Sequence, residues 1–359
     1  MTATPLRRTV RGVAALAGLL TLTLTACGLD AAEPGTSTGG RDRVLVGTSG
    51  ESAGTMLAYN VARAEGYFAD EGIEIEEVQV NGAPLILQAL MNNQANVGFL
   101  SLSTALQGRE HGKNIKLGAA VQITNDWTPI ISLRYLQKKG IDPTTFQQLP
   151  PRERFARIKG SIWAVNAAGG LYERATVYLA KHYGLDAERD IEIIPLDQTS
   201  QVAGIKDGTV NVWLSSPPNN HLLVQSGHAI ELLTHEEIVR ETPLVANARS
   251  AETIINDDWA SANRDVARRF FAAYQRGADF VVSHSTEEII ASLRKIYPDL
   301  SDDRITAIVE ANKKNTPRDS RHTAEAIEAQ IAFALASGNI KRSFTVEEAY
   351  TDAYLPPVG

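Results

Sequence analysis

The hydrophobic pattern of residues 44–133 alternates between short apolar runs and segments of helical periodicity. Short runs bounded by turn residues are typical of buried strands, and apolar residues three and four apart indicate amphipathic helices. Leu57, Val61 and Phe68 lie on one face of the first helix, and Pro84 stands at the start of the second, where its missing N–H is not needed. The predicted strands are 44–46, 73–80, 97–100, 115–121 and 130–133, and the predicted helices are 57–68 and 85–91.

The same alternation then repeats. A strand at 162–165 is followed by Gly169-Gly170 and by a helix over 171–183 that Gly184 ends. Strands at 191–194 and 210–214 flank a short helix at 202–207. Strands that alternate with helices predict an α/β fold with largely parallel sheets, here built twice in two lobes.

A short sequence match within the chain supports two related lobes. The segment 96–101, NVGFLS, resembles 211–215, NVWLS, if one inserted residue is allowed. The alternative is a chance match of a short segment. If the match is real, Ser101 and Ser215 lie at the C-terminal ends of equivalent strands, where open α/β sheets bind ligands.

Beyond residue 233 the pattern becomes helical. Four helices are predicted at 266–282, 287–297, 301–313 and 323–336, separated in part by Pro298 and Pro317. Their charged faces are most simply solvated surfaces. We expect these helices to pack on the first lobe.

The N-terminus has the pattern of an export signal. Arg7, Arg8 and Arg11 precede a short apolar run, and Leu24-Thr25-Ala26 precede Cys27, the single cysteine. This order resembles a bacterial lipobox, which implies cleavage before Cys27, lipidation of its thiol and an extracytoplasmic location on the cell membrane. The alternatives are an ordinary signal peptide or a transmembrane anchor, for which the run is too short. Residues 28–42 are rich in Gly, Ser, Thr and Pro and predict a flexible tether.

The charge of the chain argues against two kinds of partner. The net charge of the whole sequence is −7, and removal of residues 1–26, which carry three arginines and no acid, makes it −10. An acidic chain argues against nucleic-acid binding and against electrostatic attachment to anionic lipid. Membrane attachment is therefore expected to come from the lipid on Cys27.

Five segments in a fixed order carry a family resemblance. Residues 59–73, YNVARAEGYFADEGI, resemble a segment of the solute-binding proteins of nitrate, sulfonate, taurine and thiamine-precursor ABC importers. This first segment is fairly specific, and the correspondence covers about residues 44 to 285. The shorter segments that resemble the same family are Gln88-Ala89-Leu90 before Asn96-Val97, 158–162, 208–212 and Ser216-Pro217-Pro218.

The resemblance implies a two-lobed type II periplasmic-binding fold with a ligand cleft between the lobes. Lobe 1 is expected at 43–132 plus 236–359 and lobe 2 at 133–235. Such proteins close around a small solute by hinge motion and deliver it to an ABC permease. We expect a monomer without a cofactor. The sequence departs from the family at Asn96 and Asn211, where the family usually has Asp, and in 140–157, which looks like an insertion; these departures bear on the ligand.

The ligand-binding residues are expected in strand-end loops and at helix starts that face the cleft. Gly169 and Gly170 would present backbone N–H groups to an anion, or they form a plain turn. Trp127 would stack on a flat ligand, or it packs on the lobe. Glu51 and Asp126 would bind an amine, although solvated carboxylates are the simpler interpretation. The candidate residues are Ser49, Gly50, Glu51, Asn81, Gly82, Ser101, Ser103, Asp126, Trp127, Gly169, Gly170, Ser215 and Ser216.

These candidates disagree about the charge of the ligand. Backbone amides favour an anion, whereas Glu51 and Asp126 favour a cation. The predicted cleft loops contain no arginine that would clamp a strong anion. A small zwitterion, or a neutral aromatic compound with one polar edge, would satisfy both sets of groups.

Motifs of catalysis are absent from the sequence. It contains no G-x-S-x-G, no H-E-x-x-H and no P-loop, and its seven histidines lack metal-ligand spacing. Pyrimidine synthases and desulfinases that share the family's fold need cysteines, which this chain lacks if Cys27 is lipidated. We therefore expect a binding protein rather than an enzyme, with no metal. A solute-sensing adaptor lipoprotein is a further alternative.

Overall fold

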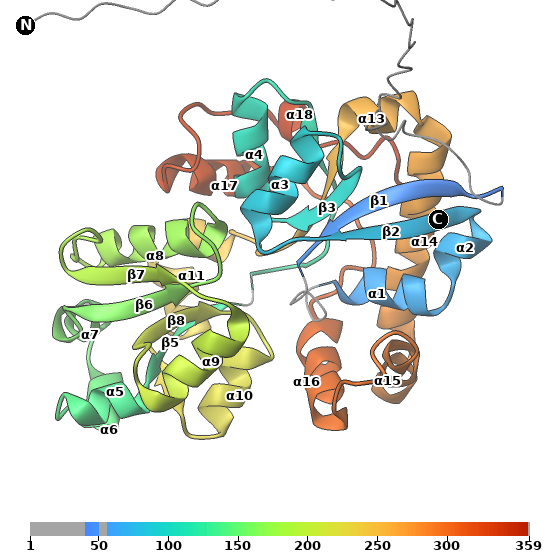
Figure 1. Ribbon diagram of the computed structural model, residues 1–359. Helices are drawn as coiled ribbons and strands as arrows, with labels where there is room; N and C mark the ends of the chain where they lie inside the picture. The colour runs from blue at the N-terminus through green and yellow to red at the C-terminus, as the bar shows by residue number, and fades with distance from the viewer. Residues whose placement is uncertain (1–39, 50–55, 126, 358–359) are drawn as a thin grey trace, which may run out of the picture. The chain divides into compact units, whose positions relative to one another are not determined.

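The computed structural model of the protein describes residues 40–49, 56–125 and 127–357. These residues contain two five-stranded sheets, each accompanied by its own helices (Figure 1). Sheet 1 has the order β2-β1-β3-β10-β4 and sheet 2 the order β7-β6-β8-β5-β9. Sheet 1 consists of β1 (Asp42–Thr48), β2 (Ile73–Gln79), β3 (Val97–Leu100), β4 (Ile115–Ala119) and β10 (Glu252–Asn256). Sheet 2 consists of β5 (Thr128–Ser132), β6 (Ser161–Val165), β7 (Ile191–Pro195), β8 (Val212–Ser215) and β9 (Ala229–Glu231).

Both sheets are largely parallel and have the same arrangement of strands. The pairs of β1 with β2 and β3 are parallel, as are those of β6 with β7 and β8. The antiparallel strand of each sheet is the one that follows a crossover: β10 in sheet 1 and β5 in sheet 2. The chain leaves sheet 1 through residues 120–127 and returns through residues 247–251. The predicted α/β fold of two lobes is confirmed.

The first lobe is built on sheet 1, and the C-terminal helices pack on it as expected. Helix α14 contacts α1 and α2, α15 and α16 contact α1, and α17 contacts α4. The helices of this lobe are α1 (Leu57–Ala64), α2 (Tyr67–Asp70), α3 (Ala83–Met91), α4 (Leu102–Glu110), α13 (Asp257–Ala262), α14 (Arg264–Ser283), α15 (Thr286–Arg294), α16 (Asp302–Lys313), α17 (Ala324–Ala336) and α18 (Val346–Ala349).

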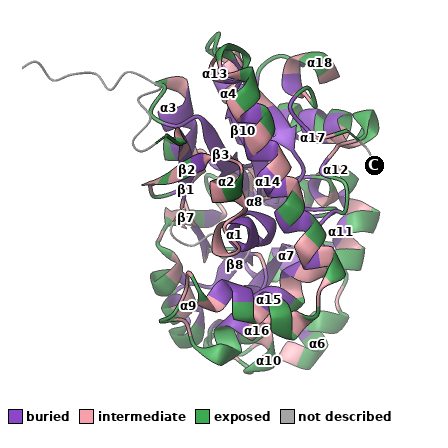
Figure 2. Cartoon of the chain, turned by 90° about the vertical axis from the view of Figure 1, so that its right-hand side faces the viewer, coloured by how far each residue is buried: buried purple, intermediate pink, exposed green. Residues whose placement is uncertain are grey.

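Helix α14 forms the centre of the larger core of this lobe. Its Phe270, Phe271 and Tyr274 are fully buried with the apolar side chains of sheet 1, and each such ring contributes about 1.5–3 kcal/mol by burial. Gly277 lets α14 approach α1, because a Cβ at this position would lie 2.2 Å from the carbonyl oxygen of Ala58. Figure 2 shows strands of both sheets in the buried colour, with helices whose outer faces are exposed.

The second lobe is built on sheet 2. Residues 140–157, which resemble an insertion, form α6 and α7, and each of these helices begins with a proline. Phe146 and Phe155 from these helices are buried in the core, so the segment is an integral part of the lobe. The helices of this lobe are α5 (Leu133–Lys138), α6 (Pro143–Gln148), α7 (Pro151–Arg157), α8 (Leu171–His182), α9 (Gln198–Asp207), α10 (Asn219–Gln225), α11 (His235–Glu241) and α12 (Pro243–Ala246).

The short sequence match between 96–101 and 211–215 corresponds to a hydrogen bond that occurs in both lobes. Asn96, just before β3, accepts a hydrogen bond from the Leu45 N–H of β1 at 2.8 Å. Asn211, just before β8, accepts one from the Ile162 N–H of β6 at 2.7 Å. Both asparagines lie at the N-terminal ends of their strands and are buried. The departure from Asp at these positions therefore concerns the framework of each sheet, far from the strand ends where ligands bind.

This register also corrects the alignment of the two lobes. Val97 pairs with Val46, and Val212 pairs with Trp163, without an inserted residue. Val97 is therefore equivalent to Val212, and the residues four positions later are Ser101 and Ser216. The equivalent of Ser101 is Ser216 rather than Ser215.

The boundaries of the lobes differ from those expected. Strand β5 was assigned to lobe 1, but it pairs with β8 and β9 of sheet 2. Ile238 of α11 and Val245 of α12 are buried in the core of the second lobe. An apolar run predicts a strand but not the sheet that it joins, which explains the difference.

Candidate functional site

A cavity of about 140 Å³ lies where the C-terminal ends of strands from both sheets meet. Ser49 follows β1, Asn166 follows β6 and Ser215 ends β8, and all three line this cavity. Ligand pockets for drug-sized compounds have about 300–1,000 Å³. The cavity therefore suits a small solute.

Most of the wall from the second lobe is polar. Its amide and hydroxyl side chains, which donate and accept hydrogen bonds without carrying charge, stand beside Trp213, Leu214, Pro217 and Pro218. The hydroxyl oxygens of Tyr172 and Ser216 are 2.7 Å apart and hold each other in place. The polar lining residues of this lobe are Asn166, Tyr172, Gln198, Gln201, Ser215, Ser216 and Asn219.

The wall from the first lobe is mostly apolar. Phe99, Leu100 and Ile86 supply hydrophobic surface, and Ser49 and Ser250 supply hydroxyls. The first lobe thus shapes the cavity, while the second lobe supplies most of its hydrogen-bonding groups.

Arg304 is the only charged side chain among the described lining residues. It comes from α16, on the first lobe, and its Nη2 donates to Gln198 Oε1 of the second lobe at 3.4 Å. The guanidinium is exposed at this position and keeps donors for a ligand. The charge of the described lining therefore favours a neutral or anionic solute.

Of the predicted site residues that the structure describes, three line the cavity: Ser49, Ser215 and Ser216. Ser101 and Ser103 do not, because they are buried at the start of α4. Ser101 Oγ accepts the Thr104 N–H at 3.2 Å and lies 3.1 Å from Ser103 Oγ. Their arrangement is that of a helix N-cap.

Trp127 is placed in the core of the second lobe. Its side chain is fully buried, and its Nε1–H donates to the carbonyl oxygen of Ala248 at 3.0 Å. Its ring meets Tyr172 edge to face at a centroid distance of 5.9 Å. Of the two interpretations of this residue, its position supports packing, and its ring contacts Tyr172, which lines the cavity.

The glycines of the predicted site lie at a contact between the lobes. A Cβ on Gly82 would lie 2.7 Å from the Cβ of Ala167, and the Gln107 side chain donates to the carbonyl oxygen of Gly169 at 3.4 Å. The Gly169 N–H, expected to face a ligand, instead donates to Glu173. Gly170 precedes α8 and, like Gly82 and Gly169, is outside the cavity lining, as is the exposed Asn81.

Four predicted positions lie outside the described residues: Cys27, Gly50, Glu51 and Asp126. The signal segment and most of the tether also fall there.

Several lining residues were not predicted from the sequence. Asn166 and Gln198 follow strand ends, so the rule that selected Ser49 would have found them. Arg304 and Ser250 carry no such signal, because they reach the cavity from a distant helix and from the second crossover.

Within residues 40–49, 56–125 and 127–357, no three or more His, Cys, Asp or Glu side chains are grouped so as to hold a metal ion. Among the same residues, no helix has the length and apolar character needed to cross a membrane.

Known proteins resemble the chain at low identity over most of its length. The protein named "Putative binding protein YtlA", from Bacillus subtilis (strain 168), is 20% identical over 256 residues, which are 71% of each chain. A solved protein from Bordetella bronchiseptica RB50 is 18% identical with a TM-score of 0.72, over 87% of this chain and 95% of that one. The alkanesulfonate-binding protein SsuA from Xanthomonas axonopodis pv. citri, solved with MOPS, is 18% identical with a TM-score of 0.60, over 86% of this chain and 98% of SsuA.

A sequence model of the NMT1-like family matches residues 53–295, which are more than half of the chain. The chain therefore belongs to the NMT1-like family and has the periplasmic binding protein fold.

Proposed function

We propose that this protein is the extracytoplasmic receptor of an ABC importer, which binds a small solute between its lobes and passes it to a membrane permease. The observation that carries the proposal is the cavity at the C-terminal strand ends, lined from both lobes. A ligand that contacts both walls favours the closed arrangement of two lobes joined by a hinge.

The lining indicates the class of solute. Amide and hydroxyl side chains from the second lobe suit a compact polar compound, and Arg304 adds one positive charge. A sulfonate, nitrate or another small acid would pair with this guanidinium. The likeness to an alkanesulfonate-binding protein supports the same class. A small aromatic or heterocyclic solute with an acidic group also satisfies these contacts.

A thermal-shift screen tests this function. Residues 37–359 form one compact unit, which is suitable for the assay. The panel contains nitrate, taurine, alkyl and aryl sulfonates, aminopyrimidines and small aromatic acids. A solute at 100 times its Kd stabilises the protein by about 2.7 kcal/mol, so a true ligand gives a clear shift. Silence to every compound contradicts the proposed solute class.

A double variant locates the binding. Asn166→Ala with Arg304→Gln changes one lining residue on each wall and is expected to abolish the shift. The control is Arg268→Gln, an exposed arginine on α14, which is expected to keep it. A shift that survives the double variant would mean that the solute binds elsewhere.

We propose in addition that lipid on Cys27 anchors the receptor to the membrane. The supporting observation is the lipobox-like Leu24-Thr25-Ala26-Cys27 after a basic and apolar segment. Cys27→Ala is expected to move the protein from the membrane fraction to the soluble fraction. Unchanged membrane attachment of this variant would contradict the anchor.

A further inference from the structure

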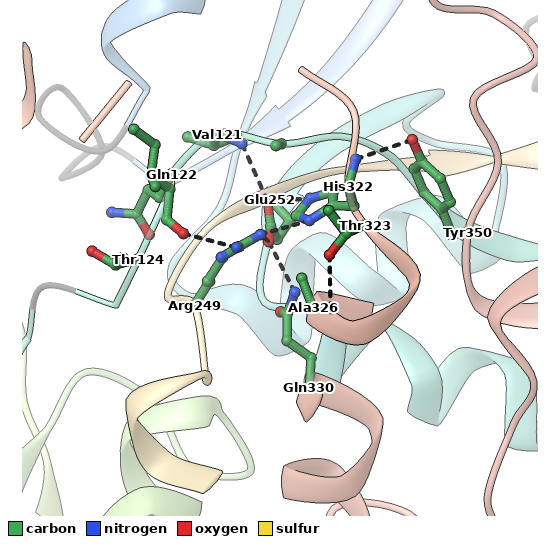
Figure 3. Close-up of polar contacts among 12 residues, drawn as sticks. Val121, Gln122, Thr124, Arg249, Glu252, His322, Thr323, Ala326, Gln330 and Tyr350 are labelled. Carbon is green, nitrogen blue, oxygen red and sulfur yellow. Dashed lines mark hydrogen bonds and ion pairs between the residues drawn. The ribbon is translucent and has the colours of Figure 1, made fainter. Parts of the chain in front are cut away.

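The two crossovers between the lobes are tied together at one buried polar cluster. The first crossover is 120–127 and the second is 247–251, and Ser250 and Ala251 of the second line the solute cavity. Figure 3 shows the cluster, in which Arg249, Glu252 and His322 lie between the first crossover and α17. The position of this cavity wall therefore depends on the cluster.

Arg249 makes one of the direct ties between the crossovers, in addition to the hydrogen bond from Trp127 to Ala248. Its Nη2 donates to the carbonyl oxygen of Ile123, in the first crossover, at 2.8 Å. Its Nη1 donates to Glu252 Oε1 at 3.3 Å and lies 2.5 Å from His322 Nδ1. The neighbouring Ser250 hydroxyl donates to Gln122 Oε1 at 3.1 Å.

Glu252 is the anion at the centre of the cluster. Its side chain is fully buried and accepts from the Val121 N–H at 3.2 Å and from Gln330 Nε2 at 3.1 Å. Burial alone would raise the pKa of this carboxyl, but His322, Arg249 and the Val121 N–H outweigh it and hold the pKa below its ordinary value. Glu252 is therefore ionised at neutral pH.

The contacts of His322 fix its protonation. A guanidinium has only donors, so the Nδ1 of His322 must accept from Arg249 and carries no proton. The proton of the neutral ring then sits on Nε2, which lies 3.2 Å from Glu252 Oε2. The side chain of His322 is 1% exposed, so this arrangement is enclosed.

We propose that His322 is a positioning residue whose protonation releases Arg249 and loosens the tie between the two crossovers. A proton from solvent would bind the Nδ1 lone pair, which removes the acceptor of Arg249 and places two positive groups against each other. The guanidinium then leaves Nδ1, and its hold on Ile123 weakens. Acidification thereby frees the wall formed by Ser250 and Ala251.

The other groups around His322 do not mimic this effect. The Tyr350 hydroxyl accepts a hydrogen bond from the backbone N–H of His322 at 3.2 Å. Burial raises the pKa of Tyr350 and that of Tyr274, which is near Glu252, so both tyrosines stay neutral. Arg321 beside it is paired with Asp319 and Asp352. Because the pKa of Glu252 is lowered, the stability that it contributes is present above the unfolded carboxyl pKa and is lost only as pH falls through the folded value. Glu252 therefore stays ionised between pH 7.5 and pH 5.5.

Hydrogen exchange of the ligand-free full chain tests the proposal. The inference rests on the proposed function only for its consequence at the cavity, and an assay without solute keeps the failure of one distinct from the failure of the other. Between pH 7.5 and pH 5.5, after correction for intrinsic exchange, protection of residues 118–125 and 247–253 is expected to fall about tenfold, the effect of losing one hydrogen bond of a charged group.

Two variants show whether His322 is responsible. His322→Gln keeps an uncharged acceptor at every pH, so its protection is expected not to change across this range. His235→Gln, at the exposed start of α11, is the matched control and is expected to keep the fall of the wild type. Constant protection in the wild type, or an equal fall in His322→Gln, would overturn the proposal.

Nitrogen NMR of the His322 ring supplies a measurement that does not depend on a variant. At pH 7.5 the wild type is expected to carry its ring proton on Nε2 alone. A ring protonated on both nitrogens at that pH would overturn the proposal even if His322→Gln failed to fold.

Discussion

The two lobes have the same arrangement of strands, but they contribute different residues to the cavity. Each has a central strand preceded by a buried asparagine, Asn96 or Asn211, which binds the neighbouring strand in the same way. Among the described residues, the second lobe lines the cavity with seven polar residues, whereas the first contributes mainly apolar surface, two serines and Arg304. The first lobe also carries the C-terminal helices and the cluster that joins the crossovers.

This difference distinguishes the residues that maintain the sheets from the residues that face the solute cavity. The features that the lobes share lie at the N-terminal strand ends and maintain the sheets. The features that differ lie at the opposite ends and face the cavity. Changes in the shared features are therefore expected to alter stability, and changes in the features that differ are expected to alter solute binding.

The largest expected effect tests whether Trp127 belongs to the framework. Trp127→Ala empties a fully buried site and removes the hydrogen bond to Ala248, so it is expected to cost about 3–5 kcal/mol of unfolding free energy. Chemical denaturation measures the loss. Trp259→Ala, at a half-buried site of the first lobe, is the control and is expected to cost less. A stable Trp127→Ala protein that no longer binds solute would restore the stacking role.

An intermediate effect tests the equivalence of the lobes. Asn96→Ala and Asn211→Ala each leave a partly buried backbone N–H without its acceptor, so each is expected to lower the unfolding free energy by about 1–3 kcal/mol. Asn81→Ala, at an exposed position, serves as control and is expected to change little. If one variant proves neutral and the other severe, the two asparagines do not have equivalent roles.

The smallest effect tests the charge of the cavity. Arg304→Gln keeps donors but removes the positive charge, so it is expected to weaken an anionic solute about tenfold, or about 1.4 kcal/mol. Titration calorimetry with the solute that gives the largest thermal shift measures this change. Arg304→Lys is the matched variant and should recover part of the affinity. Equal affinity in all three proteins would show that the solute does not contact residue 304.

The sequence predicted the fold well because local patterns determine it. Alternating strands and helices, Pro84 at the start of α3 and Gly184 after α8 all lie where the pattern placed them. Gly66 also marks a helix end, because its φ of 75° separates the predicted helix at 57–68 into α1 and α2.

The site was predicted in part because it depends on distant residues. Ser49, Ser215 and Ser216 follow from the rule that ligands bind at C-terminal strand ends. Arg304 does not, since only the packing of α16 brings it opposite Gln198. Ser101 and Ser103 satisfy the same rule as Ser49, but the start of α4 uses their hydroxyls. Strand position alone does not show which hydroxyl faces a cavity and which one caps a helix.

The most direct test of the central claim is small-angle X-ray scattering of residues 37–359, with and without the solute found in the screen. If the solute binds between the lobes and closes them, the radius of gyration decreases at saturation and stays unchanged in Asn166→Ala with Arg304→Gln. A saturated wild-type protein whose radius of gyration equals that of the free protein would contradict closure of the two lobes around a solute.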